Sequence, residues 1–485
     1  MSRDFKKNFM FDVTVIGGGV VGGLILRELS KYDLKVCLLE KREDVAMGQS
    51  RANSGIVHAG FDAPVGSLKA KFNVLGNKMM ASVCAELGVE CKNNGSLVVA
   101  FSDEELLALR ELKARGEKNG VQGLVLIDKR QLKARENNIS DDAIGALYAP
   151  TGGIVCPYKL TIASIGNAMD NGAQLFTEFD VVAVKDKDGA YVLTSADGRK
   201  IESKIVINSA GIGTEKIANL FGDYSFKVSG RKGEYILLDK ESRGFVKHTL
   251  FFTPTEKGKG ILVSPTVDEN ILLGPTAELV DDGNTETTAD GLNEVQQKAM
   301  KMCKGVPFFN TITSFAGTRA YCDRHDFIIE RSGVASRLIN CAGIESPGLT
   351  ASPAIAEYVV GTLVKELLPL NKKENFNGKR KADDFFNKMK VEEKNALIKE
   401  NPSYGRIICR CEQITEGEIV RAINTNPRAT TIDAVKRRTR SGMGRCQGGF
   451  CQPQVAEIIA RELSIPLEQV TKSGKGSYLL VGKSK

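Results

Sequence analysis

The stretch that decides the fold covers residues 11–40 and reads FDVTVIGGGVVGGLILRELSKYDLKVCLLE. The apolar run at residues 13–16 predicts a strand of a parallel sheet, because such strands are buried on both faces. A glycine-rich turn follows it, and the leucines at positions 24, 26 and 29 then favour a helix. A second apolar run at residues 36–39 predicts the next strand. This order of strand, turn, helix and strand predicts a βαβ unit that opens an α/β domain.

The turn of this unit has the spacing of a dinucleotide-binding loop. Gly17, Gly19 and Gly22 fit the pattern G-x-G-x-x-G: the first allows the tight turn, the second admits a pyrophosphate, and the third lets helix and strand pack closely. The N-terminus of the following helix favours an anion. Glu40, at the end of the second strand, can bind a ribose diol, which favours FAD or NAD over NADP. An ordinary strand–turn–helix is the alternative, but it does not explain five glycines among seven residues.

The composition is that of a globular protein with several domains. The chain has 485 residues, 42% of them hydrophobic and 26% charged, which suits two to four domains of roughly 100–200 residues each. The net charge of +8 suits anionic substrates or an acidic partner and is too small to indicate nucleic acid. The sequence contains no apolar run of signal-peptide or membrane-spanning type, which predicts a cytoplasmic protein that contacts membranes only through a partner.

The middle of the chain changes character. Residues 226–320 hold short β-rich segments such as GEYILLD and GILVSPT, which predict a mostly antiparallel sheet in a cap or substrate domain. Residues 145–160 are interpreted as a turn-rich connection. An α/β pattern returns with a strand at 338–342 and a glycine-rich loop at 343–350, whose helix directs a second positive dipole at the site. Residues 371–400 are lysine-rich and predict a linker with helical stretches.

Three further segments carry a family resemblance: RANSGIVHAG at 51–60, INSAGIG at 207–213 and CAGIESPGLTASPAIAEYV at 341–359. With them, residues 10–368 resemble the FAD-dependent oxidoreductases of the D-amino-acid-oxidase type. The resemblance implies an α/β fold in which a β-rich antiparallel cap interrupts a Rossmann-like FAD-binding domain. The FAD-binding domain would occupy 1–85, 146–225 and 321–370, the cap 86–145 and 226–320, a linker 371–400, a small four-cysteine iron–sulfur domain 401–472 and a tail 473–485.

The same resemblance implies which residues hold FAD in an extended form. Adenine would lie at the first βαβ unit, and the isoalloxazine between the loop at 50–60, Ala210 with Gly211, and the turn at 343–350. A strand that ends in Ala210 and Gly211 before a helix also lets backbone approach a cofactor. The implied cofactor contacts are Gly17, Gly19, Gly22, Glu40, Lys41, Arg51, Asn53, Ser54, Gly55, Val181, Ala210, Gly211, Gly343, Gly348, Leu349 and Thr350.

Two side chains are candidates for catalysis. His58 lies in the expected flavin loop and would act as a general base or orient the ring, although a histidine in a folded chain is more often structural. The family places an arginine that binds the substrate anion where Arg319 stands, and a guanidinium fork suits phosphate or carboxylate. The alternative for Arg319 is a surface salt bridge. Weaker candidates, more often structural, are Lys69, Tyr235, His248 and His325.

Four of the eleven cysteines stand near the end of the sequence. Cys409 and Cys411 form a C-x-C pair, Cys446 and Cys451 form a C-x4-C pair, and thirty-four residues separate the pairs. Cysteine-only ligation suits zinc or an iron–sulfur cluster, but zinc sites favour C-x2–4-C pairs. The arrangement resembles the bacterioferritin-associated ferredoxin domain, which implies a [2Fe–2S] cluster. The other seven cysteines are predicted to be small buried hydrophobic residues.

A basic segment precedes the second cysteine pair. Its cations would offset the negative charge of a thiolate cluster or dock a partner, and the alternative is a solvated face. These residues are Lys436, Arg437, Arg438, Arg440 and Arg445.

The resemblance implies a dehydrogenase that acts on an anionic CH–OH donor. The C-terminal domain matches the architecture of the large subunit of anaerobic glycerol-3-phosphate dehydrogenase. The expected reaction is therefore oxidation of sn-glycerol 3-phosphate to dihydroxyacetone phosphate by hydride transfer to flavin N5, with electrons passing via the cluster to a partner redox subunit. The stretch NSGIVHAGFDAPVGSLKAKFNVLGN is similar to the L-2-hydroxyglutarate enzymes, so that or a similar 2-hydroxy acid is the alternative substrate. A non-catalytic electron-transfer subunit is a second alternative.

Overall fold

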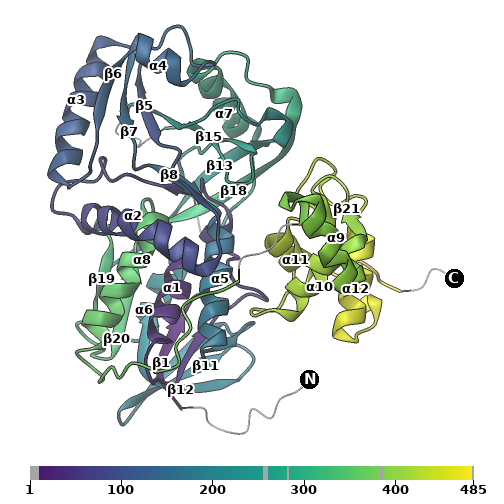
Figure 1. Cartoon of the computed structure of the whole chain (residues 1–485). Coiled ribbons are helices and arrows are strands. Elements are labelled where there is room, and N and C mark those ends of the chain that lie inside the picture. Colours follow the sequence, from purple (N-terminus) through teal and green to yellow (C-terminus); the bar gives the residue numbers. More distant parts are fainter. Residues whose placement is uncertain (1–9, 255–259, 281–282, 382–385, 483–485) are drawn as a thin grey trace.

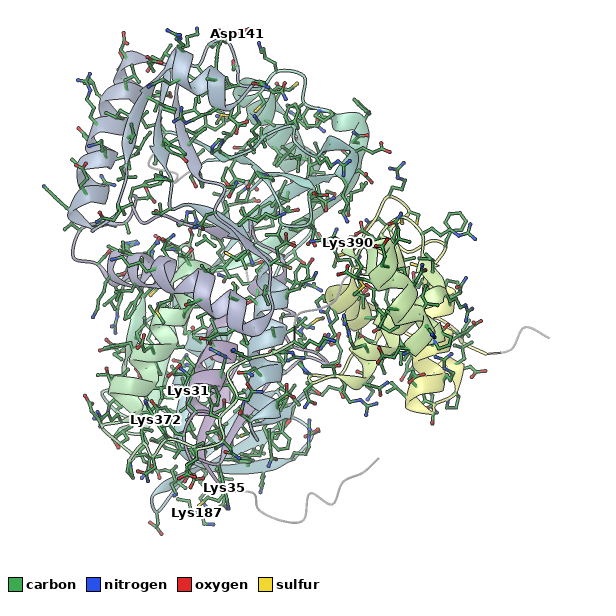
Figure 2. All side chains as sticks on the ribbon, in the orientation of Figure 1. Lys31, Lys35, Asp141, Lys187, Lys372 and Lys390 are labelled. Carbon is green, nitrogen blue, oxygen red and sulfur yellow. The ribbon has the colours of Figure 1, made fainter. Side chains whose placement is uncertain are left out.

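The computed structural model describes residues 10–254, 260–280, 283–381 and 386–482. They form a body with two large sheets and a smaller helical unit beside it (Figure 1). Lys35 and Lys187 lie at the end of the body that the first sheet forms, and Asp141 lies at the opposite end, beyond the second sheet (Figure 2). Within these described ranges, no helix is both long and apolar enough to cross a membrane.

The first sheet has the glycine-rich stretch near its centre. Its strands are β1 (Met10–Ile16), β2 (Val36–Leu39), β9 (Gln174–Phe176), β10 (Val181–Lys187), β11 (Ala190–Ser195), β12 (Lys200–Asn208), β19 (Ile328–Arg331) and β20 (Leu338–Ala342). They follow the order β10-β11-β12-β1-β2-β9, and β20 pairs with β12 and β19. The strands β9, β2, β1, β12 and β20 are parallel. Val13 and Val15 of β1 are fully buried, as the apolar run predicts.

Helices cover this sheet and supply much of its core. They are α1 (Val20–Leu29), α2 (Leu68–Leu87), α5 (Pro157–Asp170), α6 (Thr214–Leu220) and α8 (Gly348–Tyr358). α1 packs on α5 and α8, and α2 packs on α8. Gly76 permits the last contact, because a Cβ there would lie 2.0 Å from the carbonyl oxygen of Thr350. Since α1 and α8 follow parallel strands of one sheet, their N-termini lie at the same edge, where such folds bind ligands.

The second sheet forms the other half of the body. Its strands are β5 (Ser96–Ala100), β6 (Val125–Asp128), β7 (Gly145–Ala149), β13 (Val228–Leu238), β14 (Thr249–Phe252), β15 (Leu262–Pro265), β16 (Ile271–Gly274), β17 (Glu278–Val280) and β18 (Thr311–Cys322). The order is β17-β13-β16-β15-β14-β5-β7-β6, and β18 pairs with β13 along its length. The pairs are antiparallel, as predicted, except β14 with β5. The associated helices are α3 (Asp103–Lys118), α4 (Lys129–Arg135) and α7 (Ala289–Met302).

The interpretation of residues 145–160 as a connection is wrong in its first part. β7 pairs with β5 and β6 inside the second sheet. β8 (Gly153–Val155) then joins β3 (Ile56–Val57) and β4 (Cys91–Lys92) in a small separate sheet. Glycine and alanine in β7 have a weak strand preference, so only the pairing partners reveal this strand. We therefore propose that the first cap segment extends to Ala149.

The C-terminal unit has its own hydrophobic core. Its elements are β21 (Ile407–Cys409), β22 (Ile414–Thr415), α10 (Glu416–Asn424), α11 (Ile432–Thr439) and α12 (Gln452–Leu463). Ile419, Val435 and Ile459 are fully buried in that core. Helix α9 (Val391–Glu400) lies in the segment predicted as a linker with helical stretches. The unit contacts the body at α5, next to α11 (Figure 1).

Three of the five residues of the basic segment anchor the C-terminal unit to the body and are buried, so at these positions the segment is not a solvated face, whereas Arg445 is exposed. Arg437 Nη2 donates to Asp44 at 2.7 Å, and Arg438 donates to both oxygens of Asp44 at 2.9 Å. Arg440 donates to Asp268 at 2.8 Å. Burial alone would raise the pKa of Asp44, but Arg438 and Arg437 outweigh it and lower the pKa to about 2. These arginines therefore dock the C-terminal unit onto the body of the same chain.

Replacing Asp44 with alanine should loosen this junction. Removing one member of a buried ion pair costs about 3–5 kcal/mol, because Arg437 and Arg438 stay buried without their carboxylate. We expect faster tryptic cleavage in the lysine-rich segment 371–400 at pH 7. Because folding lowers the pKa of Asp44, its ion pairs stabilise the folded protein fully at pH values above the pKa of an unfolded aspartate, which is about 3.9. This stabilisation is lost as the pH falls toward the folded-state pKa of about 2.

The matched control is Asp141→Ala, which removes an exposed carboxylate that pairs with Lys133 and Lys304. Exposed ion pairs contribute about 0–1 kcal/mol, so this variant should be cleaved like the wild type. Unchanged cleavage of Asp44→Ala would show that the arginines do not hold the unit in place.

Candidate functional site

A cavity of about 990 Å³ lies between the two sheets. Its walls come from the turns after β1 and β12, the loop after β2, the turn before α8, and the facing strands β13 and β18. The turns lie at the carboxyl ends of parallel strands, which is the edge where α/β folds bind ligands. The cavity extends from Glu40 at the cofactor end to Arg319 on the cap strand.

The glycines of the β1–α1 turn serve two purposes. Gly17 has a φ of +108°, and a Cβ there would lie 2.5 Å from the carbonyl oxygen of Ser209. A Cβ at Gly22 would lie 2.1 Å from the carbonyl oxygen of Gly17, so the fold itself needs glycine at both positions. A Cβ at Gly19 would meet only the Ser50 hydroxyl, at 3.3 Å. Gly19 therefore leaves room at the N-terminus of α1, as an FAD pyrophosphate requires.

Glu40 lines the same cavity, and two backbone donors hold its carboxylate. Oε2 accepts a hydrogen bond from Gly18 N–H at 2.8 Å, and Oε1 accepts one from Arg42 N–H at 2.9 Å. Burial raises the pKa of Glu40, and these two hydrogen bonds oppose the shift. Each carboxylate oxygen has a further lone pair, so Glu40 can still accept a hydrogen bond from a ribose hydroxyl.

The loop after β2 is fixed from both sides. Asn53 Nδ2 donates to the carbonyl oxygen of Gln49 at 2.9 Å, and Asn53 Oδ1 accepts from Gly55 N–H at 2.9 Å. Strand β18 closes on the loop, since a Cβ at Gly317 would lie 2.0 Å from the carbonyl oxygen of Ala52. Besides Gly17, Gly19 and Glu40, the expected cofactor contacts that line the cavity are Lys41, Arg51, Asn53, Ser54, Gly55, Val181, Ala210, Gly211, Gly348 and Leu349.

Gly22, Gly343 and Thr350 were expected to contact the cofactor, but they lie behind the cavity wall. Gly343 has a φ of +64°, and a Cβ there would lie 2.6 Å from Cys322 Cβ. The buried Thr350 hydroxyl accepts from His58 N–H at 2.8 Å. These residues hold the wall in shape, because each packs against a neighbouring turn or strand. A sequence motif does not show which residues of a turn line the cavity and which lie behind its wall.

His58 lines the cavity, and hydrogen bonds hold its backbone in place. Its carbonyl oxygen accepts from Asn73 Nδ2 at 2.7 Å and from Asn77 Nδ2 at 3.1 Å. The ring nitrogen Nε2 lies 3.2 Å from Ser346 Oγ in the turn before α8. The ring centre lies 5.8 Å from that of Phe251. His58 is therefore placed where the loop after β2 and the turn before α8 meet.

Two arginines face each other across the cap strands. Arg319 on β18 stands directly opposite Arg231 on β13, and both line the cavity. Arg319 Nη2 donates to the carbonyl oxygen of Thr276 at 3.2 Å, whereas its buried Nε–H has no partner among the residues that the structure describes. Like charges at opposed positions destabilise a sheet. An anion bound between the two guanidinium groups would remove this repulsion.

Arg231 is not recognisable from the sequence, because no motif surrounds it and only the strand register brings it opposite Arg319. Its guanidinium lies 4.0 Å from the ring centre of Tyr321 and 3.8 Å from a carboxylate oxygen of Glu345. Lys69 Nζ lies 3.0 Å from the other oxygen of Glu345. Glu345 therefore offsets part of the positive charge, while Arg319 has no carboxylate partner within the described ranges.

The remaining weaker candidates differ in their positions. His248 lies away from the cavity, where its Nδ1 contacts Glu136 Oε1 at 2.6 Å. Tyr235 lines the cavity with its hydroxyl 3.3 Å from Ser54 Oγ, and burial raises its pKa. His325 also lines the cavity, and Tyr321 lies 2.8 Å from its Nδ1. His248 is therefore structural, whereas Tyr235 and His325 border the candidate substrate region.

The four C-terminal cysteines come together in the small unit. The sulfur atoms of Cys409 and Cys411 are 3.9 Å apart, and those of Cys411 and Cys446 are 3.7 Å apart. Contact with Cys409 lowers the pKa of Cys451 to about 7. These separations exceed the roughly 2.05 Å of a disulfide bond. They match the separation of about 3.8 Å between two thiolates on one tetrahedral metal with bonds of about 2.3 Å.

The sulfur positions favour a cluster over a single zinc ion. Contacts link Cys451 with Cys409, Cys409 with Cys411, and Cys411 with Cys446. Such a set of four linked thiolates fits two irons bridged by sulfide.

Comparison with known proteins identifies both parts of the chain. The family described as FAD dependent oxidoreductase matches residues 12–361, and the BFD-like [2Fe-2S] binding domain matches residues 407–461. A glycerol 3-phosphate dehydrogenase of Caloramator mitchellensis is 48% identical over 98% of this chain and 99% of its own. A mitochondrial L-2-hydroxyglutarate dehydrogenase of Bos taurus is 32% identical over 56% of this chain and 61% of its own.

A solved structure extends this agreement to the fold. Dithionite-reduced L-alpha-glycerophosphate oxidase from Mycoplasma pneumoniae with FAD bound has a TM-score of 0.73 and 31% sequence identity, over 77% of this chain and 98% of that chain. The cavity with its open Gly19 and the set of four linked thiols fit the two cofactors that these family descriptions name. The chain therefore belongs to the FAD dependent oxidoreductases and carries a BFD-like [2Fe–2S] binding domain.

Proposed function

We propose that the chain is a dehydrogenase that oxidises sn-glycerol 3-phosphate to dihydroxyacetone phosphate and passes the electrons through a [2Fe–2S] cluster to a partner redox subunit. The observation that carries the proposal is the pair of opposed arginines, Arg231 and Arg319, in the cavity. The glycerol 3-phosphate dehydrogenase that is 48% identical over nearly the whole chain supports this choice of substrate. We further propose a cytoplasmic location, with membrane contact only through the partner subunit.

Different residues of the cavity would hold FAD, bind the substrate and accept its proton. The glycine turn, Glu40 and the loop at 49–55 would hold FAD, which supplies a ring nitrogen, N5, that accepts a hydride. Arg231 and Arg319 bind the phosphate, because two guanidinium forks suit its oxygens and its charge. His58 Nε2 accepts the hydroxyl proton as general base.

Replacing Arg319 with alanine should reduce kcat/KM for glycerol 3-phosphate by about 10–1000-fold. A charge-assisted hydrogen bond contributes roughly 1.5–3 kcal/mol, and more when a bidentate pair is desolvated; each 1.36 kcal/mol is about a factor of ten. Arg319→Lys should recover part of the loss by charge without the fork. Steady-state kinetics with a dye acceptor under anaerobic conditions measures both variants.

FAD content should be the same in the wild type and both variants, because Arg319 lies on the cap strand. Arg324→Ala is a matched control, since Arg324 forms an ion pair with Glu330 outside the cavity. Turnover by Arg319→Ala within about twofold of the wild type would mean that the anion binds elsewhere, and Lys69 would be the next residue to replace.

A second candidate substrate is L-2-hydroxyglutarate or a similar 2-hydroxy acid. The guanidinium pair also suits carboxylates, and the Bos taurus relative is a dehydrogenase of that acid. Anaerobic assays with glycerol 3-phosphate, L-2-hydroxyglutarate and unphosphorylated glycerol distinguish the two. We expect kcat/KM to be highest for glycerol 3-phosphate; a higher value for L-2-hydroxyglutarate would reverse the assignment, and no bleaching of the flavin by any of them would indicate a non-catalytic subunit.

A further inference from the structure

One segment of the loop after β2 contacts both the cofactor cavity and the C-terminal unit. Residues 41–42 and 47–51 line the cavity, whereas Asp44 lies outside the lining and pairs with Arg437 and Arg438 of α11. Asp44 is only 4% exposed. The segment at 41–51 is therefore held between the cavity and the docked C-terminal unit.

Asp44 stands between two backbone hydrogen bonds that shape the cofactor end of the cavity. Two residues before it, Arg42 N–H donates to the Glu40 carboxylate at 2.9 Å. Two residues after it, Ala46 N–H donates to the carbonyl oxygen of Gly18, in the glycine turn, at 2.8 Å. Each residue spans at most about 3.6 Å of backbone, so a displacement of Asp44 would pull on both hydrogen bonds.

The far end of the same segment contacts the N-terminus of α1. Ser50 Oγ accepts a hydrogen bond from the N–H of Val20, the first residue of α1, at 2.9 Å. The adjacent Arg51 lines the cavity. Burial lowers the pKa of Arg51 and Arg437 of α11 lowers it further, while Asp433 of the same helix opposes the shift. The charges of α11 therefore act on a residue of the cavity wall.

The C-terminal unit touches the segment at a second point. The backbone at Gly474 lies against the side chain of Glu43, since a Cβ at Gly474 would lie 2.9 Å from Glu43 Cγ and Cδ. The carbonyl oxygens of Thr471 and Lys472 accept hydrogen bonds from the first turn of α11, at 3.2 and 2.9 Å. Helix α11 and the chain that follows Thr471 thus form one surface, which contacts both Glu43 and Asp44.

We propose that Arg437 and Arg438 position the loop that binds FAD, so that docking of the C-terminal unit and binding of FAD stabilise each other. Two events that favour the same loop conformation are coupled, and the coupling acts equally in both directions. The arginines are positioning residues, because they act on the cavity only through Asp44 and its neighbours. A chain that holds FAD thereby keeps its cluster unit docked, whichever substrate it oxidises.

The dissociation constant for FAD, measured on the full-length protein, tests one direction of the coupling. Dilution of the holoprotein releases FAD, and the fluorescence of free FAD reports the released fraction. Coupling between two sites typically changes an affinity about 5–150-fold, so we expect the Kd to rise about fivefold or more in Arg438→Gln. Asp44→Asn should have a similar effect, and the double variant should add little, because both changes remove the same ion pair.

Tryptic cleavage of the segment 371–400 tests the other direction. In the wild type, removal of FAD should speed cleavage about fivefold or more, and added FAD should restore protection. In Arg438→Gln, cleavage should be fast and should change less than about twofold when FAD is added. A junction that only holds the unit in place would give no response to FAD in either protein.

The matched control is Arg461→Gln, which removes an arginine that pairs with Glu416 and Glu462 inside the C-terminal unit. Its Kd for FAD and its protection by FAD should equal those of the wild type. Iron content reports whether the unit of each variant is folded. If Arg438→Gln lacks iron, Arg437→Gln takes its place, since Arg437 also donates to Asp44.

Two results would overturn the coupling. One is a Kd for FAD within about twofold of the wild type in both Asp44→Asn and the arginine variant. The other is cleavage of the wild type at the same rate with and without FAD. Neither measurement uses a substrate, so both outcomes are independent of the reaction proposed above.

Discussion

Replacing Gly19 with leucine should leave the chain folded and unable to retain FAD. A Cβ at this position meets only the Ser50 hydroxyl, at 3.3 Å, so the fold itself tolerates a side chain. The rest of the leucine would occupy the space in front of the N-terminus of α1, where a pyrophosphate binds. The visible spectrum and the FAD released on denaturation measure the loss, and the circular dichroism and thermal midpoint report whether the fold is retained.

The matched control for this substitution is Gly361→Leu, because a Cβ at Gly361 would meet no atom within 4 Å and Gly361 lies outside the cavity. It should bind FAD like the wild type. Gly22→Leu should instead fail to fold, because its Cβ would lie 2.1 Å from a backbone oxygen. The iron content of Gly19→Leu should be normal, since the C-terminal unit has its own core. A full complement of FAD in Gly19→Leu would place the pyrophosphate elsewhere.

Replacing Cys446 with serine should remove iron and inorganic sulfide completely while FAD stays bound. The sulfur of Cys446 lies 3.7 Å from that of Cys411, and three thiolates do not complete the four-cysteine set. Reduction of the flavin by glycerol 3-phosphate should survive, because the cavity lies in the body. Transfer to a protein acceptor should fail. Iron and sulfide analysis and the low-temperature electron paramagnetic resonance signal of the reduced protein measure the effect.

Cys91→Ser is the matched control, because Cys91 is another partly exposed free cysteine outside the C-terminal unit. Its iron content should equal that of the wild type. Cys409→Ser should behave like Cys446→Ser, although its sulfur is buried. Stoichiometric zinc without iron in anaerobically prepared wild-type protein would be incompatible with a [2Fe–2S] centre.

The cofactor sites could be predicted from the sequence because their chemistry depends on residues that are close along the chain. The turn from Gly17 to Gly22 needs its glycines within one strand–helix connection, and Glu40 follows at the end of the next strand. The pairs Cys409 with Cys411 and Cys446 with Cys451 likewise carry their spacing in the sequence. Short-range geometry of this kind is encoded locally, so a motif is sufficient to detect it.

The substrate end of the cavity and the role of the basic segment were decided by tertiary structure alone. Arg231 becomes part of an anion site only because β13 and β18 pair in a register that places it opposite Arg319. Arg437 and Arg438 become anchors only because the C-terminal unit folds back onto Asp44, almost four hundred residues earlier in the chain. Strand register and domain docking arise from non-local burial and charge pairing. No pattern of neighbouring residues records them, so the sequence determined the cofactors and the tertiary structure determined what surrounds them.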